Sequence, residues 1–135
     1  MRLFDTTFLV DLVNEDKGAV ELAERIDEEK SFKGISVITV YEYLLGVHRL
    51  YGSSKQLQEK LESANRDLSP FEVLPLSNEI ARECSQLQAN LQRKGRMLGV
   101  NDLYIAATAL SFRLGLVTRN FDDFKKVPNL SVENY

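Results

Sequence analysis

The sequence has little of the chemistry that builds disulfide, zinc or multi-histidine sites. Its 135 residues include one cysteine, Cys84, and one histidine, His48. A single cysteine excludes an internal disulfide framework and a cysteine-ligated zinc site. A single histidine excludes a multi-histidine metal centre. We interpret Cys84 as an inert packing residue and expect the chain to work in a reducing compartment, the cytoplasm.

Long apolar segments and a large excess of one charge are also missing. No apolar run approaches the roughly 18 residues of a membrane-spanning helix. The acid at Asp5 comes too early for a secretory signal. With 17 basic and 20 acidic residues, the net charge of −3 argues against a protein that coats DNA. It leaves open a nuclease that gathers carboxylates around a metal and keeps its basic residues in a local patch.

The composition that remains is that of one globular domain, which we expect to cover residues 1–135. Hydrophobic residues make up 44% of the chain and charged residues 27%, and no repeat or linker interrupts it. A chain of this length buries about two-thirds of its unfolded surface, which is enough for one core.

Short apolar segments alternate with longer amphipathic ones. The expected strands cover residues 2–5, 35–38, 71–76, 115–118 and 130–133. The expected helices cover residues 8–13, 18–30, 39–51, 55–67, 77–94 and 103–110. Strands that alternate with helices predict an α/β fold with a mainly parallel sheet.

Several acids lie where a purely structural role is not the only explanation. Asp5 follows the first strand and Asp102 begins an apolar helix, so either acid could be a helix cap. Glu42 lies in an apolar helical segment, where an acid is uncommon unless it is paired, hydrogen-bonded or metal-bound. Asp122 and Asp123 follow a late strand and could form a solvated turn.

A doubly wound sheet can bring these positions to one edge, outside the carboxyl ends of its strands. Three or four carboxylates raise one another's pKa when they lie close together. A hard divalent cation such as Mg²⁺ or Mn²⁺ would resolve that repulsion, because it prefers oxygen ligands.

Four segments, in order, resemble the motifs of PIN-domain ribonucleases, and most of all those of VapC toxins. The segments are residues 3–7, 40–46, 99–107 and 116–124, and residues 127–130 and 133–135 resemble the family's ending. The resemblance implies a PIN-like α/β/α sandwich with a mainly parallel central sheet. It also implies an Mg²⁺-dependent endoribonuclease that acts as the toxin of a toxin–antitoxin pair.

The resemblance assigns catalytic roles to four acids and supporting roles to three polar residues. The catalytic residues would be Asp5, Glu42, Asp102 and Asp123, with Asp5 and Asp102 as the metal ligands. The supporting residues would be Thr6, Thr118 and Asn120. Many relatives have an aspartate where this chain has Asn120, which leaves open whether Asn120 or Asp123 completes the site. Asp122 is interpreted as a solvated neighbour.

Partners follow from the same resemblance. The candidate RNA contacts are Arg93, Lys94, Arg96 and Arg119, although a solvated helix end explains Arg93 and Lys94 equally well. A VapB-like antitoxin and a second copy of the chain would be protein partners, with the antitoxin over a groove formed by the early helices. Apolar residues of segments 8–13 and 41–47 could supply such surfaces, or could be plain core.

Three other kinds of protein share part of this pattern. A PIN fold that has lost activity could act as a binding partner or co-repressor with its antitoxin. A phosphatase that forms an aspartyl-phosphate would need a second acid two positions after Asp5, where this chain has Thr7. A phosphoacceptor domain would need a lysine after a late strand, and no lysine matches that position.

Overall fold

The computed structural model describes residues 1–135 and contains five strands and seven helices. The strands are β1 (Arg2–Phe4), β2 (Lys33–Ser36), β3 (Glu72–Leu74), β4 (Gly115–Val117) and β5 (Val132–Glu133). The helices are α1 (Thr6–Val13), α2 (Lys17–Glu29), α3 (Val37–Tyr51), α4 (Leu57–Leu68), α5 (Asn78–Arg93), α6 (Val100–Ser111) and α7 (Phe121–Phe124). No helix is both long enough and apolar enough to span a membrane.

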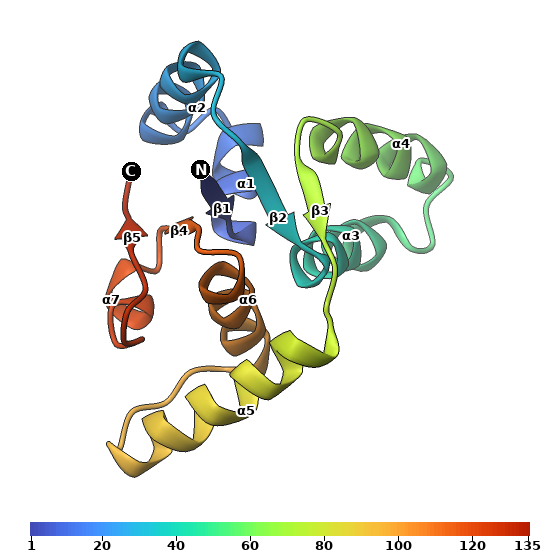
Figure 1. The fold of residues 1–135 in the computed structure, drawn as a ribbon. Coiled ribbons are helices and arrows are strands. Elements are labelled where there is room, and N and C mark those ends of the chain that lie inside the picture. The colour runs from blue at the N-terminus through green and yellow to red at the C-terminus, as the bar shows by residue number, and fades with distance from the viewer.

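The five strands form one sheet in the order β3-β2-β1-β4-β5, and every neighbouring pair is parallel (Figure 1). The predicted α/β class with a mainly parallel sheet is therefore confirmed. The chain builds β1, β2 and β3 outward in one direction and then returns to add β4 on the other side of β1. Such a reversal beside β1 is where open α/β sheets bind their ligands, at the carboxyl ends of the strands.

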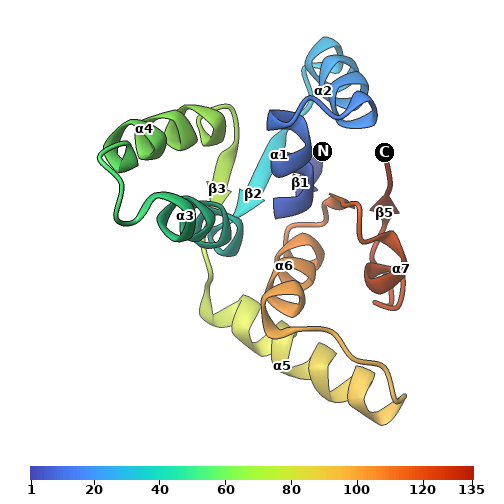
Figure 2. The same ribbon diagram turned by 180° about the vertical axis from the view of Figure 1, so that it is seen from behind.

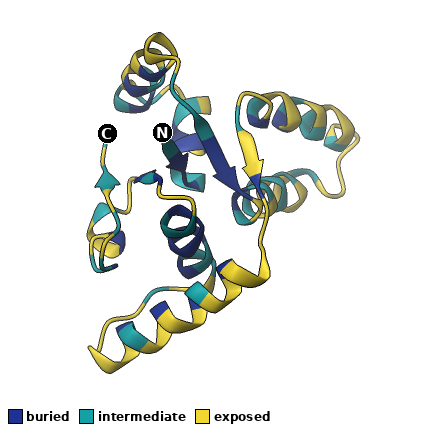
Figure 3. Cartoon of the chain, viewed as in Figure 1, coloured by how far each residue is buried: buried dark blue, intermediate teal, exposed yellow.

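Helices cover both faces of the sheet because successive strand residues point to opposite sides. Leu3 and Leu116 belong to a core shared with α5 and α6, whereas Phe4 and Val117 belong to a core shared with α1 and α2. Figure 2 shows the two groups of helices from behind, and Figure 3 shows buried residues along β1, β2 and α6, whereas β3 is mostly exposed. The small residues Ala106, Ala107 and Ala109 are fully buried, which lets α6 pack closely on α5.

Two local predictions were wrong. The segment expected as a strand at 35–38 leaves the sheet after Ser36, because the Ser36 hydroxyl accepts a hydrogen bond from the Ile38 N–H and caps α3. Residues 121–124, where no helix was expected, form the short helix α7, so Asp122 and Asp123 lie in a helix rather than in a solvated turn. The other strand and helix ends lie within three residues of the expected positions. Gly95 ends α5 as predicted, with a φ of 67° that favours glycine.

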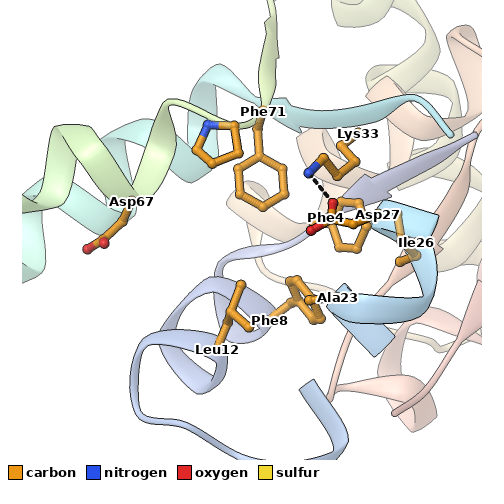
Figure 4. A pocket seen from close by; sticks show the side chains of 10 residues that line it. Phe4, Phe8, Leu12, Ala23, Ile26, Asp27, Lys33, Asp67 and Phe71 are labelled. Atoms are coloured by element: carbon orange, nitrogen blue, oxygen red, sulfur yellow. Dashed lines mark hydrogen bonds and ion pairs between the residues drawn. The ribbon is translucent and has the colours of Figure 1, made fainter. Parts of the chain in front are cut away.

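A small apolar pocket of about 130 Å³ lies between α1, α2 and the start of β3. Figure 4 shows Phe4, Phe8 and Phe71 on its wall, and the ion pair between Lys33 and Asp27 beside it. None of the four acids predicted as catalytic lines this pocket.

Candidate metal-dependent nuclease site

Asp5 is a buried carboxylate at the reversal point of the sheet, with 3% of its surface exposed. It caps α1, since its Oδ1 accepts the Phe8 N–H at 3.3 Å. The same oxygen accepts the Thr7 hydroxyl at 2.5 Å, and Oδ2 accepts the Thr118 hydroxyl at 2.6 Å. Burial raises the pKa of Asp5, and these hydrogen bonds oppose the rise.

Two threonine hydroxyls connect Asp5 to the loop after β4. The Thr7 hydroxyl accepts the Arg119 N–H at 3.1 Å, and the Thr118 hydroxyl accepts the Asn120 N–H at 3.0 Å. Each hydroxyl therefore donates to Asp5 and accepts from the loop. This arrangement fixes the ends of β1 and β4 against each other.

Glu42 extends from α3 toward the start of α1 and is partly buried. Its Oε1 accepts the Thr6 hydroxyl at 2.6 Å, and its Oε2 accepts the Asn101 amide at 3.4 Å. Although Glu42 lies in an apolar stretch of sequence, its carboxylate has polar partners from two other helices, α1 and α6. Thr6, expected as a supporting residue, contacts Glu42 rather than Asp5.

Asp102 lies in the first turn of α6, where Gly99 caps the helix without a side-chain hydrogen bond. Its pKa is raised to about 6, first by burial and then by the negative charges of Glu42, Asp5 and Asp123. All three neighbours act in the same direction, so the other three acids predicted as catalytic lie within electrostatic reach of Asp102. A capping role does not explain Asp102.

Asp123 and Asn120 differ in how closely they belong to this group. Asp123 lies in α7, its side chain is half-exposed, and it pairs with Lys126 at 3.5 Å. Its charge has the smallest effect on the pKa of Asp102 among the three acids. The backbone of Asn120 binds Thr118, and no hydrogen bond is made by its side chain. Asp122 is exposed and pairs with Lys125 at 2.8 Å.

No three of the acids, the histidine and the cysteine are arranged as a ready-made metal cage. The donor set nevertheless fits Mg²⁺, which is usually held by one or two carboxylates and keeps several waters. The carboxylate of Asp5 is already oriented by two hydroxyl donors, and burial and then the charges of three other acids raise the pKa of Asp102, so a divalent cation would offset negative charge at this edge.

The four basic residues expected to contact RNA lie in two places. Arg93, Lys94 and Arg96 are exposed at the end of α5 and in the following loop, which extends away from the sheet (Figure 1). Arg119 lines an open cleft with Thr6 and Glu42, so it is the basic candidate next to the acids.

Sequence reasoning missed several polar residues around the site. Thr7 and Asn101 are adjacent to predicted site residues, and their hydroxyl and amide groups were the signal that could have identified them. Asp11 pairs with Arg119 and accepts a hydrogen bond from the Tyr135 hydroxyl. No motif in the sequence connects these three positions.

The fold is a doubly wound, all-parallel α/β sheet with acids at the carboxyl ends of its strands, and relatives of the chain are named as ribonucleases. The chain belongs to the PIN-domain family, whose match spans residues 2–130. Ribonuclease VapC2 of Rickettsia felis is 29% identical over 133 residues, 98% of this chain and 96% of the relative. The tRNA(fMet)-specific endonuclease VapC of Salmonella typhimurium is 32% identical over 116 residues, 84% of this chain and 83% of the relative.

A solved structure agrees with this assignment. VapBC2 from Rickettsia felis, bound to a DNA fragment from its promoter, superposes with a TM-score of 0.85 at 30% identity. The match covers 99% of this chain and 98% of the VapBC2 chain. The resemblance to VapC-type PIN-domain ribonucleases is confirmed, and the α/β/α sandwich is the fold of that family.

Proposed function

We propose that residues 1–135 form a single PIN domain that acts as an Mg²⁺-dependent endoribonuclease in the cytoplasm. The observation that carries this proposal is the gathering of acids at the reversal point of the sheet: Asp5 is buried beside the parallel ends of β1 and β4, and burial together with the charges of Glu42, Asp5 and Asp123 raises the pKa of Asp102 to about 6. Perturbed titratable groups of this kind are typical of functional sites. Relatives named as ribonucleases and as an RNA-specific endonuclease support the same chemistry.

Asp5 and Asp102 would hold the cation, with Mg²⁺ preferred and Mn²⁺ as the alternative. When bound, the cation would neutralise charge on the phosphate and lower the pKa of a water molecule. Asp5 reaches this role with its carboxylate already oriented by Thr7 and Thr118. Glu42 and Asp123 would complete the shell or orient the attacking water. In-line attack would leave a 5′-phosphate and a 3′-hydroxyl.

The supporting polar residues act on the carboxylates. Thr6 holds Glu42, Thr118 holds Asp5, and Asn120 would supply a hydrogen bond without charge beside them. Arg119 would bind an RNA phosphate in the cleft, while Arg93, Lys94 and Arg96 would contact a more distant part of the RNA. Transfer RNA and ribosomal RNA are both candidate substrates.

A VapB-like antitoxin and a second copy of the chain are the proposed protein partners. Support for the antitoxin comes from similar structures described as VapBC complexes. Of the apolar residues considered for such surfaces, Phe8 and Leu9 are buried, whereas Val10, Val13 and Tyr41 are 43%, 49% and 54% exposed. These three are the most exposed apolar side chains of the two segments and offer the largest surface to a partner.

The test is cleavage of total cellular RNA by the purified protein, free of antitoxin, with Mg²⁺, with Mn²⁺ or with a chelator. Asp5→Asn is the inactive variant, and Asp122→Asn is the matched control because Asp122 is an exposed acid paired with Lys125. We expect discrete cuts that need the cation, persist in Asp122→Asn and disappear in Asp5→Asn. Mapping the new ends identifies the RNA and the bond that is cut.

A catalytically inactive binding partner or co-repressor is the alternative. Similar complexes have been solved with DNA fragments, which suits a promoter-binding role for those complexes. If folded wild-type protein and Asp5→Asn show the same lack of metal-dependent cleavage, the alternative replaces the enzyme.

A further inference from the structure

Arg119 lies at an open cleft of about 390 Å³ beside the acids. The cleft is lined by Thr6, Thr7, Val10, Asp11, Glu42 and Arg119. Arg119 is the basic member of this lining, and its backbone N–H is held by the Thr7 hydroxyl, which also binds Asp5. The position of Arg119 is thus connected to the candidate metal site by two hydrogen bonds.

The guanidinium of Arg119 is held from one side. Its Nη2 contacts Asp11 Oδ2 at 2.8 Å and Asp16 Oδ1 at 3.5 Å. Both contacts use the same nitrogen, so the Nε and Nη1 donors have no partner within the chain. Because a guanidinium binds phosphate through two donors in a fork, the free donors are the ones that such binding needs.

Asp11 is itself fixed by a distant residue. Its side chain is 12% exposed, and its Oδ2 also accepts the Tyr135 hydroxyl at 2.5 Å. The Tyr135 ring packs edge-on against Phe8, with 5.3 Å between the ring centroids. Asp11 therefore presents one oxygen to Arg119 from a position that the core of α1 and Tyr135 determine together.

We infer that Asp11 is a positioning residue for RNA binding: braced by Tyr135, it orients Arg119 so that the free guanidinium donors receive a phosphate in the cleft. This inference rests on the proposed ribonuclease function. It goes further by naming the residues outside the carboxylate site that prepare the cleft for the RNA backbone.

The direction in which RNA binding changes when Asp11 is removed distinguishes a positioning role from a purely electrostatic one. An acid near bound RNA repels its phosphates, so removing Asp11 would tighten RNA binding if Asp11 acted through its charge alone. If Asp11 positions Arg119, its removal weakens binding. Asp16→Asn is the matched control, because it removes the same charge at a longer distance from Arg119 and keeps an asparagine that can still cap α2.

The experiment measures KM and kcat on an RNA oligonucleotide that carries a mapped cleavage site. For Asp11→Ala we expect KM to rise about tenfold with kcat within about twofold, since the lost contact acts on binding. Asp11→Asn keeps an acceptor oxygen and gives a smaller rise, and Asp16→Asn gives none. Arg119→Gln lowers the slope of log K against log salt by about 0.7, the value for one phosphate on a single strand.

A second measurement does not depend on RNA. Amide hydrogen exchange should accelerate at Arg119 and Asn120 in Asp11→Ala and in Tyr135→Phe, with core amides of β1 and β4 unchanged.

If wild type cleaves RNA but Asp11→Ala leaves KM unchanged or lowers it, the positioning role is wrong and the proposed ribonuclease function stands. If amide exchange at Arg119 is also unchanged, Asp11 does not order the loop. If wild type neither binds nor cleaves RNA, the proposed function and the inference both fail.

Discussion

The Thr118 hydroxyl donates a hydrogen bond of 2.6 Å to Asp5 Oδ2 across a separation of 113 residues. The contact exists because β1 and β4 are parallel neighbours, with Phe4 opposite Val117, so the residues that follow them meet at the sheet edge. Since this hydrogen bond favours the ionised carboxylate, it opposes the effect of burial on the pKa of Asp5. Thr118 thereby helps to keep Asp5 ready to bind a cation.

Replacing Thr118 by valine should raise the pKa of Asp5 further, because one stabilising donor is lost. We expect the loss of cleavage to be larger at pH 6 than at pH 8, because a carboxyl with a higher pKa is protonated more at the lower pH. The measurement is the pH profile of kcat/KM at fixed Mg²⁺. Thr118→Ser keeps the hydroxyl and should behave like wild type; an equal loss at both pH values in Thr118→Val would point to a structural defect instead.

Asp102 should make the metal-free protein less stable as the pH rises. Its folded pKa of about 6 lies above the ordinary value of 3.8, so the folded state binds the proton more tightly than the unfolded chain. The stabilisation is therefore fully present below pH 3.8 and is lost as the pH rises through about 6. After allowance for solvent screening, the loss is about 1–2 kcal/mol.

Asp102→Asn should remove this pH dependence and raise the melting temperature at pH 7 in the presence of a chelator. Added Mg²⁺ should stabilise wild type and leave the variant unchanged, because a ligand stabilises only the state that binds it. Thermal unfolding from pH 4 to 8 checks both effects. A wild-type protein that Mg²⁺ fails to stabilise at any concentration would count against Asp102 as a ligand.

Much of this site could be predicted from the sequence, because its acids lie at positions that a parallel sheet brings together. Asp5 follows β1, and Asp102 begins an apolar helix whose burial was visible in its small residues. The contact between Asp11 and Tyr135 could not be predicted, since the two residues are 124 positions apart and no pattern connects segment 8–13 with the chain's ending at 133–135. The start of α3 was misplaced because β-branched residues follow Ser36, and the capping hydroxyl outweighs their strand preference.

Glu42→Gln should reduce kcat about 100-fold, the scale of a lost general base or water-orienting group. The fold should persist because the glutamine carbonyl oxygen can still accept the Thr6 hydroxyl. The loss of a negative charge should also lower the pKa of Asp102, since Glu42 is the carboxylate that raises it most. Single-turnover cleavage measures the change in kcat. Glu59→Gln, at an exposed position of α4, is the control for a neutralised acid. Equal rates for the two variants would remove Glu42 from the catalytic set.

Asp123 and Asn120 are the two candidates for the fourth polar group of the site, and a pair of variants distinguishes between them. Asp123 adds charge that reaches Asp102, but its side chain is half-exposed and pairs with Lys126. We expect Asp123→Asn to lower kcat/KM about tenfold, less than loss of a buried acid, because water screens its charge. Asn120→Ala should cost less, since the Asn120 contact to Thr118 uses the backbone.

The control for this pair is Asp122→Asn, which changes the same charge one residue away. Kinetics at low and high salt add a second criterion, because the effect of an exposed charge weakens as salt rises. If Asp123→Asn and Asp122→Asn are equally active at low salt, the site consists of Asp5, Glu42 and Asp102. If Asn120→Ala is the more damaging change, the side chain of Asn120 supplies the fourth polar group of the site. Asp123 then acts only through its ion pair with Lys126.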